Sequence, residues 1–175
     1  GLALLAALPL FAALAARPRL LAGLSLSLGV AIFFAAACAG GLTGVPGQLL
    51  DNATGSQFPL LPWAGYVFVG GALGAVAARG DPRRLAVGCV ALLLVGVAVW
   101  AVAAQLKPLH PELRMTLVAN HGQRTLMVSL IALALLGLER VLPALWSASL
   151  PVRFVELFGT SSLSAYFFHE VLLYR

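Results

Sequence analysis

The sequence predicts an all-α fold, in the form of a multi-pass bundle of transmembrane helices. The 175 residues are 61% hydrophobic and 10% charged, and their mean hydropathy is +0.99. Ordinary soluble domains do not have this balance. The apolar residues also gather into long segments, and the arginines lie mainly in the short connections between them. Because the backbone must satisfy its own hydrogen bonds in lipid, each segment is expected to be a helix.

Six apolar segments follow one another, with ranges 2–16, 20–40, 58–78, 85–104, 125–142 and 154–174. The first is followed by an RPR turn, the second is rich in Leu, Ala and Phe, and the last is the most polar. As a helix, the first would extend about 22 Å, less than a hydrocarbon core of about 30 Å. We therefore expect about six spans in one transmembrane domain over 1–175, the C-terminal portion of a longer protein.

The third segment contains the most distinctive stretch, FPLLPWAGYVFVGGALG at residues 58–74. Proline is tolerated in the first turn of a helix, and tryptophan is typical of the membrane–water boundary. Gly70 and Gly74 form a GxxxG pair, a pattern that lets another helix approach closely in lipid. The stretch thus predicts the entrance and body of a packed transmembrane helix.

The connections alternate in charge, which predicts the orientation of the helices. Connections 17–19, 79–84 and 139–153 together hold seven arginines, whereas 41–57 and 105–124 hold three basic residues. By the positive-inside rule the first group is cytoplasmic. The FPLLPW stretch then faces the outer side of the membrane.

The net charge of +5 does not predict nucleic-acid binding. The basic residues lie between apolar segments and do not form a patch with interleaved aromatic residues. The abundance of Ala, Gly, Leu, Val and Arg indicates a GC-rich bacterial genome. We therefore expect the protein to lie in the bacterial cytoplasmic membrane, with the lipid bilayer as its first partner. Whether the protein forms an oligomer is left open.

The sixth segment contains the first group of candidate cavity-lining residues. Ser162, Tyr166 and His169 share one helix face at spacing i, i+4, i+7, and Glu170 lies one turn beyond Tyr166. Ionisable groups inside a membrane span are costly and are functional candidates by default. The alternative is a structural hydrogen bond between His169 and a neighbouring helix.

The second group of candidates lies on the predicted outer side. Trp63 and Tyr66 could stack on a sugar ring, or they could be interfacial aromatic residues. His121 and Arg124 lie in the predicted outer loop 105–124. Arg124 could hold a phosphate or carboxylate at the mouth of the fifth helix, or it could be a solvated arginine.

No metal site is predicted, because His110, Glu112 and His121 do not have the spacing of a zinc signature. The chain also contains no phosphate-binding glycine loop, nucleophile elbow or CxxC motif. The residue pattern by itself therefore predicts no particular reaction.

Two stretches resemble one known family. FPLLPWAGYVFVGGALG resembles the FPLLPW-type segment and glycine-rich helix of bacterial membrane proteins related to heparan-alpha-glucosaminide N-acetyltransferase. LFGTSSLSAYFFHEVLLY resembles the later G-x-x-S-L-x-x-Y-x-x-H helix of these proteins and of the wider membrane acyltransferase 3 group. The positions that match are Phe58, Pro59, Pro62, Trp63, Gly70, Ser162, Leu163, Tyr166 and His169.

The resemblance implies an integral membrane acyltransferase that moves an acetyl group from cytoplasmic acetyl-CoA to a glycan or amino sugar on the outer side. In this family the histidine credited with catalysis lies upstream of FPLLPW, so the catalytic residue is expected outside this chain. The matching positions are then family framework and candidates for lining the cavity. Two alternatives stay open: a transporter or permease with His169 and Glu170 in a proton or substrate path, and a non-catalytic membrane scaffold.

Overall fold

The computed structural model describes residues 2–39, 60–78 and 80–142, together with the isolated positions 44, 47 and 50. The chain divides into two units, Gly1–Leu133 and Ala134–Arg175. Of the second unit, the described part is the end of one helix and the residue after it. The packing described below belongs to the first unit.

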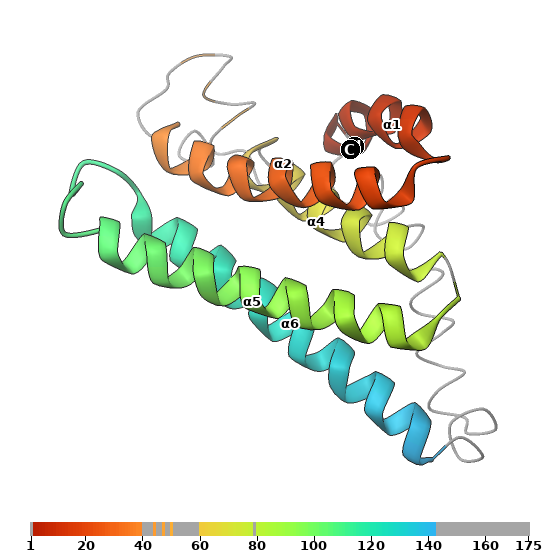
Figure 1. Ribbon diagram of the computed structural model, residues 1–175. Helices are drawn as coiled ribbons and strands as arrows, with labels where there is room; N and C mark the ends of the chain where they lie inside the picture. Colours follow the sequence, from red (N-terminus) through yellow and green to blue (C-terminus); the bar gives the residue numbers. More distant parts are fainter. Residues whose placement is uncertain are drawn as a thin grey trace, which may run out of the picture. The chain divides into compact units, whose positions relative to one another are not determined.

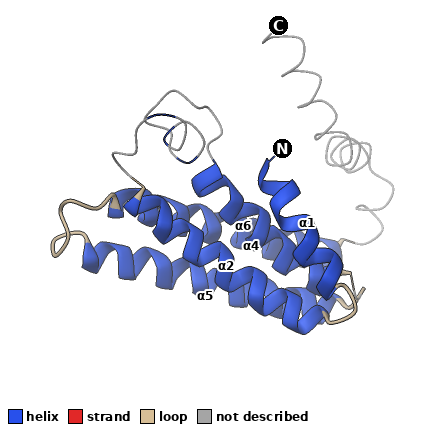
Figure 2. Ribbon diagram, turned by 90° about the horizontal axis from the view of Figure 1, so that it is seen from above, coloured by secondary structure: helices blue, strands red, loops and turns tan. Residues whose placement is uncertain are grey.

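The elements of the described ranges are all α-helices, and these ranges contain no strand (Figures 1 and 2). The helices are α1 Leu2–Leu14, α2 Pro18–Cys38, α4 Leu60–Ala77, α5 Pro82–Leu106 and α6 Met115–Val141. The predicted all-α fold is thereby confirmed for this part of the chain. The second, third and fourth predicted segments agree with α2, α4 and α5 to within a few residues at each end.

Three of these helices, α2, α4 and α5, are long and apolar enough to cross a membrane. This finding supports an integral membrane protein, but it does not support the predicted six spans. Helix α1 has 13 residues and is too short. Helix α6 has 27 residues, but its first turns carry Asn120, His121, Gln123 and Arg124, and it is not among the candidate spans. The predicted segment 154–174 lies outside the described residues.

Helix α5 begins where its sequence provides a cap. Asp81 is the N-cap residue, and its carboxylate accepts hydrogen bonds from the backbone N–H groups of Arg83, at 2.9 Å, and Arg84, at 3.4 Å. Pro82 follows in the first turn, where its missing N–H costs nothing. The cap satisfies two N–H groups that the start of a helix leaves without intrahelical partners.

The entrance of α4 contains a break at the proline of the FPLLPW stretch. Leu61 has an extended backbone, with φ −99° and ψ 126°. A proline disfavours the helical conformation of the residue before it, so the regular part of α4 begins at Pro62. The FPLLPW stretch therefore does form the entrance of a helix, as predicted, and the helix becomes regular at Pro62.

The helix ends of the first unit fall into two groups. At one end, the backbone N–H of Arg114 donates to the carbonyl oxygen of Ala37 at 3.4 Å, which joins the connection 107–114 to the end of α2. We call this the loop end. The other end holds the α1–α2 and α4–α5 turns, and Arg19, Arg83 and Arg84 line one cavity there. We call this the arginine end. Arg19, Arg83 and Arg84 therefore lie at the same end, as the charge pattern predicted.

Two pairs of helices approach closely at glycines. In the α2–α4 pair, a Cβ built on Gly29 would lie 2.9 Å from the carbonyl oxygen of Gly65. In the α5–α6 pair, a Cβ built on Gly96 would lie 2.9 Å from the carbonyl oxygen of Gly122. Real Cβ atoms essentially never come this close to backbone atoms. Small residues at such crossings are the usual basis of helix packing in membranes.

The predicted GxxxG pair does not serve as a packing surface in the described part. A Cβ built on Gly70 or Gly74 would have no atom within 4 Å. Gly65, one turn earlier in α4, makes the close approach instead. The described residues therefore do not show the close approach that was predicted at Gly70 and Gly74.

Candidate functional site

The main candidate site lies near the loop end and is centred on His121 of α6. The sequence predicted His121 and Arg124 in the outer loop 105–124, with a helix beginning only at 125. That prediction is wrong, because the helix already begins at Met115. The first turns of α6 bury Met115, Val118 and His121, and this packing outweighs the polar composition from which the loop was predicted.

His121 is held by residues from two other helices. Its side chain is 2% exposed, and its Nδ1 lies 2.6 Å from the phenolic oxygen of Tyr66 on α4. The imidazole also stacks on the ring of Phe33 on α2, with a centroid distance of 5.0 Å and an interplanar angle of 11°. One side chain of α6 thus joins α2 and α4.

The second ring nitrogen of His121 has no hydrogen-bond partner among the described residues. Nε2 is buried and forms no hydrogen bond in the described part of the structure. If Tyr66 donates to Nδ1, Nε2 carries a buried N–H; if Nδ1–H donates to Tyr66, Nε2 carries a free lone pair. A buried polar group without a partner is costly, so Nε2 is a functional candidate.

Two further predicted candidates lie beside His121. The Trp63 and Tyr66 rings are 5.9 Å apart at an angle of 50°, and Tyr66 packs edge-on against Phe33 at 5.1 Å. Trp63 is 39% exposed, so the aromatic group extends from a buried histidine to the surface. Arg124 is exposed on α6 and brings positive charge near Tyr66 and His121. Trp63, Tyr66, His121 and Arg124, predicted from separate parts of the sequence, therefore lie together.

Hydrogen bonds within α6 satisfy the buried hydroxyl groups that follow His121. Thr125 Oγ1 donates to the carbonyl oxygen of His121 at 2.9 Å, and Ser129 Oγ donates to that of Thr125 at 2.8 Å. Both side chains are buried. The donor of each hydroxyl is therefore satisfied within α6, whereas Nε2 has no partner among the described residues.

The remaining candidates do not join this cluster or lie outside the described residues. His110 Nδ1 and Glu112 Oε1 lie 3.2 Å apart on the exposed connection 107–114. A hydrogen bond from its own backbone N–H, assisted by His110, lowers the pKa of Glu112. Within the described ranges no group of three His, Cys, Asp or Glu residues could hold a metal ion. The predicted candidates outside the described residues are Ser162, Tyr166, His169 and Glu170.

Sequence reasoning missed Phe33, the stacking partner of His121. Phe33 is 1% exposed and lies on the buried stripe of α2 that also contains Leu21, Ser25 and Gly29. The four-residue spacing of these positions is the sequence signal that could have identified Phe33 as part of a buried helix face. It is weak in a membrane helix, where apolar residues cover all faces.

Comparisons with known proteins identify no relative of this chain. No protein-family model, no curated protein and no solved structure matches it.

Proposed function

We propose that this chain is part of an integral membrane acyltransferase of the bacterial cytoplasmic membrane. The enzyme would move an acetyl group from cytoplasmic acetyl-CoA to a glycan or amino sugar on the outer side. The resemblance of the two sequence stretches supplies the reaction class. The three helices long and apolar enough to cross a membrane are compatible with it.

The observation that carries the proposal is the buried Nε2 of His121. Its Nδ1 is occupied by Tyr66 at 2.6 Å, whereas Nε2 has no hydrogen-bond partner among the described residues. An acceptor hydroxyl or amine could supply the missing partner. The loop end, which the charge pattern predicts to be the outer end, is where such an acceptor would arrive.

We assign His121 to acceptor binding, because the resemblance implies a catalytic histidine upstream. Nε2 would hydrogen-bond the acceptor, and Trp63, at the exposed edge of the aromatic group, would stack on the sugar ring. Since His121 is 2% exposed, the acceptor could reach Nε2 only after neighbouring side chains move. Acetyl transfer then forms a C–N or C–O bond to the acceptor and breaks the C–S bond of the thioester. The leaving thiolate takes up the proton that the acceptor loses.

The proposal is tested with the full-length protein in sealed vesicles that hold radiolabelled acetyl-CoA on the cytoplasmic face. Glucosamine serves as the probe acceptor on the opposite face, and labelled acetylglucosamine is measured. We expect His121→Gln to raise the KM for glucosamine about tenfold, the value of one lost hydrogen bond, with a smaller effect on kcat. The matched control is His110→Gln, because His110 is an exposed histidine of the 107–114 connection at the loop end.

Each other outcome counts against a defined part of the proposal. An equal KM in the two variants would show that His121 only links the helices and does not bind the acceptor. Accumulation of glucosamine in the vesicles without acetylation would favour the transporter alternative. Absence of both activities with this probe would contradict the amino-sugar acceptor.

A further inference from the structure

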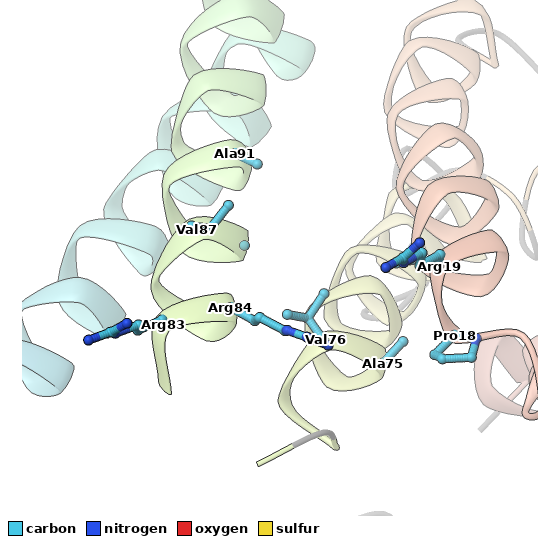
Figure 3. A pocket seen from close by; sticks show the side chains of 10 residues that line it. Pro18, Arg19, Ala75, Val76, Arg83, Arg84, Val87 and Ala91 are labelled. Atoms are coloured by element: carbon cyan, nitrogen blue, oxygen red, sulfur yellow. The ribbon is translucent and has the colours of Figure 1, made fainter. Parts of the chain in front are cut away.

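A cavity of about 520 Å³ opens at the arginine end of the first unit, between α2, α4 and α5 (Figure 3). Most of its lining is apolar, contributed by side chains such as Ala75, Val76 and Val87. Three arginines complete the lining: Arg19, Arg83 and Arg84. An apolar cavity with positive charge at one edge has the chemistry to bind an anionic amphiphile.

The side chains of the three arginines point in different directions. In Figure 3, Arg84 extends from α5 toward Val76 of α4, and Arg19 extends from α2 toward the same space, whereas Arg83 points to the other side of α5. The Nε of Arg84 is paired with Asp81 Oδ2 at 3.1 Å, which leaves its terminal amino groups for another ligand. Arg19 forms no salt bridge with any described residue. Arg19 and Arg84 are therefore the two guanidinium groups that can face an anion in the cavity.

Two further apolar cavities follow the first one along α2, the second lined by α2, α4 and α5 and the third by α2 and α5, and we call the three together the groove. A second cavity of about 170 Å³ shares Ala22, Val76, Gly88 and Ala91 with the first. A third, of about 550 Å³, also has Leu26 in its lining and lies further along α2 toward the loop end. Among the described residues, no charged side chain lines the second or third cavity.

The length of the groove agrees with that of a lipid chain in one leaflet. From Arg19 to Leu26 helix α2 rises about 10 Å, and the third cavity extends this distance. One leaflet contributes about half of a hydrocarbon core of about 30 Å. A phosphate held at the arginine end would therefore leave its acyl chain lying along the first two cavities and the start of the third.

We propose that this groove is a binding site for an anionic phospholipid, with the phosphate at Arg19 and Arg84 and one acyl chain lying along α2 against α4 and α5. Guanidinium groups bind phosphate oxygens through paired N–H donors. The alanine and glycine residues of the groove leave room for the chain. The site lies at the end opposite His121 and does not depend on the acyltransferase proposal.

The experiment measures lipid retention on the full chain by native mass spectrometry, with dioleoylphosphatidylglycerol as the anionic probe and dioleoylphosphatidylcholine as the zwitterionic one. We expect preferential retention of phosphatidylglycerol. A basic residue near an anionic membrane surface contributes about fivefold to binding, so Arg19→Gln and Arg84→Gln should each weaken phosphatidylglycerol retention by at least that factor. The matched control is Arg17→Gln, which removes the same charge from an exposed position near Arg19 that does not line the cavity, and it should have the smaller effect. Ala91→Phe, which fills the groove without changing charge, should also reduce retention.

The outcomes separate a built site from its alternatives. Equal losses in Arg17→Gln and Arg84→Gln would mean diffuse electrostatic attraction and would overturn the proposal. Unchanged retention in Ala91→Phe would show that the acyl chain does not lie in the groove, and this result would also overturn the proposal. In a further arm, glycerol phosphate and acetyl-CoA compete with phosphatidylglycerol. Displacement by either at equal concentration would identify a site for soluble phosphates instead of lipid. Thermal unfolding of every variant verifies that each is folded.

Discussion

Gly96 of α5 and Gly122 of α6 face each other where the two helices cross. A Cβ built on Gly96 would lie 2.9 Å from the carbonyl oxygen of Gly122 and 2.8 Å from the backbone nitrogen of Leu126. A Cβ built on Gly122 would lie 2.6 Å from the backbone nitrogen of Trp100. The contacts are with backbone atoms, which cannot move aside as a flexible side chain can. Gly122 also follows His121 directly, so this crossing positions the candidate site.

The first prediction concerns this crossing. Gly96→Ala should lower the free energy of unfolding in detergent by about 1–3 kcal/mol, because the new methyl group must push the two backbones apart. Gly70→Ala is the control, since a Cβ there meets no atom within 4 Å. That control should be neutral or stabilise the protein by up to about 1 kcal/mol, the usual gain when alanine replaces glycine in a helix. A Gly96→Ala variant as stable as Gly70→Ala would contradict the close crossing.

The second prediction concerns the hydrogen bond between Tyr66 and His121. Tyr66→Phe should cost about 1–3 kcal/mol of stability, because it leaves the buried Nδ1 without a partner. In the double variant Tyr66→Phe/His121→Phe both partners are apolar, so its cost should be smaller than the sum of the two single costs. The measurement is a double-mutant cycle of thermal or denaturant unfolding. Strict additivity would show that the two side chains are not coupled.

The third prediction concerns the start of α5. Asp81→Ala should destabilise the protein by about 1 kcal/mol, because the N–H groups of Arg83 and Arg84 lose the carboxylate that caps them. Asp81→Asn is the control, since asparagine is as good an N-cap as aspartate. The measurement is the midpoint of thermal unfolding in detergent. A midpoint for Asp81→Ala equal to that of Asp81→Asn would mean that the cap has no energetic role.

The fourth prediction concerns the orientation in the membrane. A cysteine at Arg83 should be shielded from a membrane-impermeant thiol reagent in intact cells, and one at Lys107 should be labelled. The positive-inside rule places the arginine end in the cytoplasm, and Lys107 lies at the loop end. The background must lack both native cysteines, Cys38, which is exposed, and Cys89, which is buried. The reverse labelling pattern would place the loop end in the cytoplasm and the acceptor site on the wrong side for the proposed transfer.

The segments that became α2, α4 and α5 could be predicted from sequence because lipid leaves the backbone few choices. A long apolar segment must form its own hydrogen bonds, and a helix allows this within one segment. The prediction failed for residues 115–124 for a related reason. Their polarity suggested a loop, but the buried face of Met115, Val118 and His121 extends the helix through them.

The sequence by itself determined the helical membrane class of this protein, the course of its three candidate spans, and the placement of Arg19, Arg83 and Arg84 at one end. Tertiary structure decided which glycines meet and that His121 lies between Phe33 and Tyr66. Tyr66 and His121 are 55 positions apart in the chain. Their meeting depends on how each helix is rotated about its axis. In a soluble helix the apolar stripe reveals that rotation, but lipid is as apolar as a leucine-rich helix face and leaves no such stripe. The buried face is therefore selected by close packing between helices, which the pattern of apolar residues does not record.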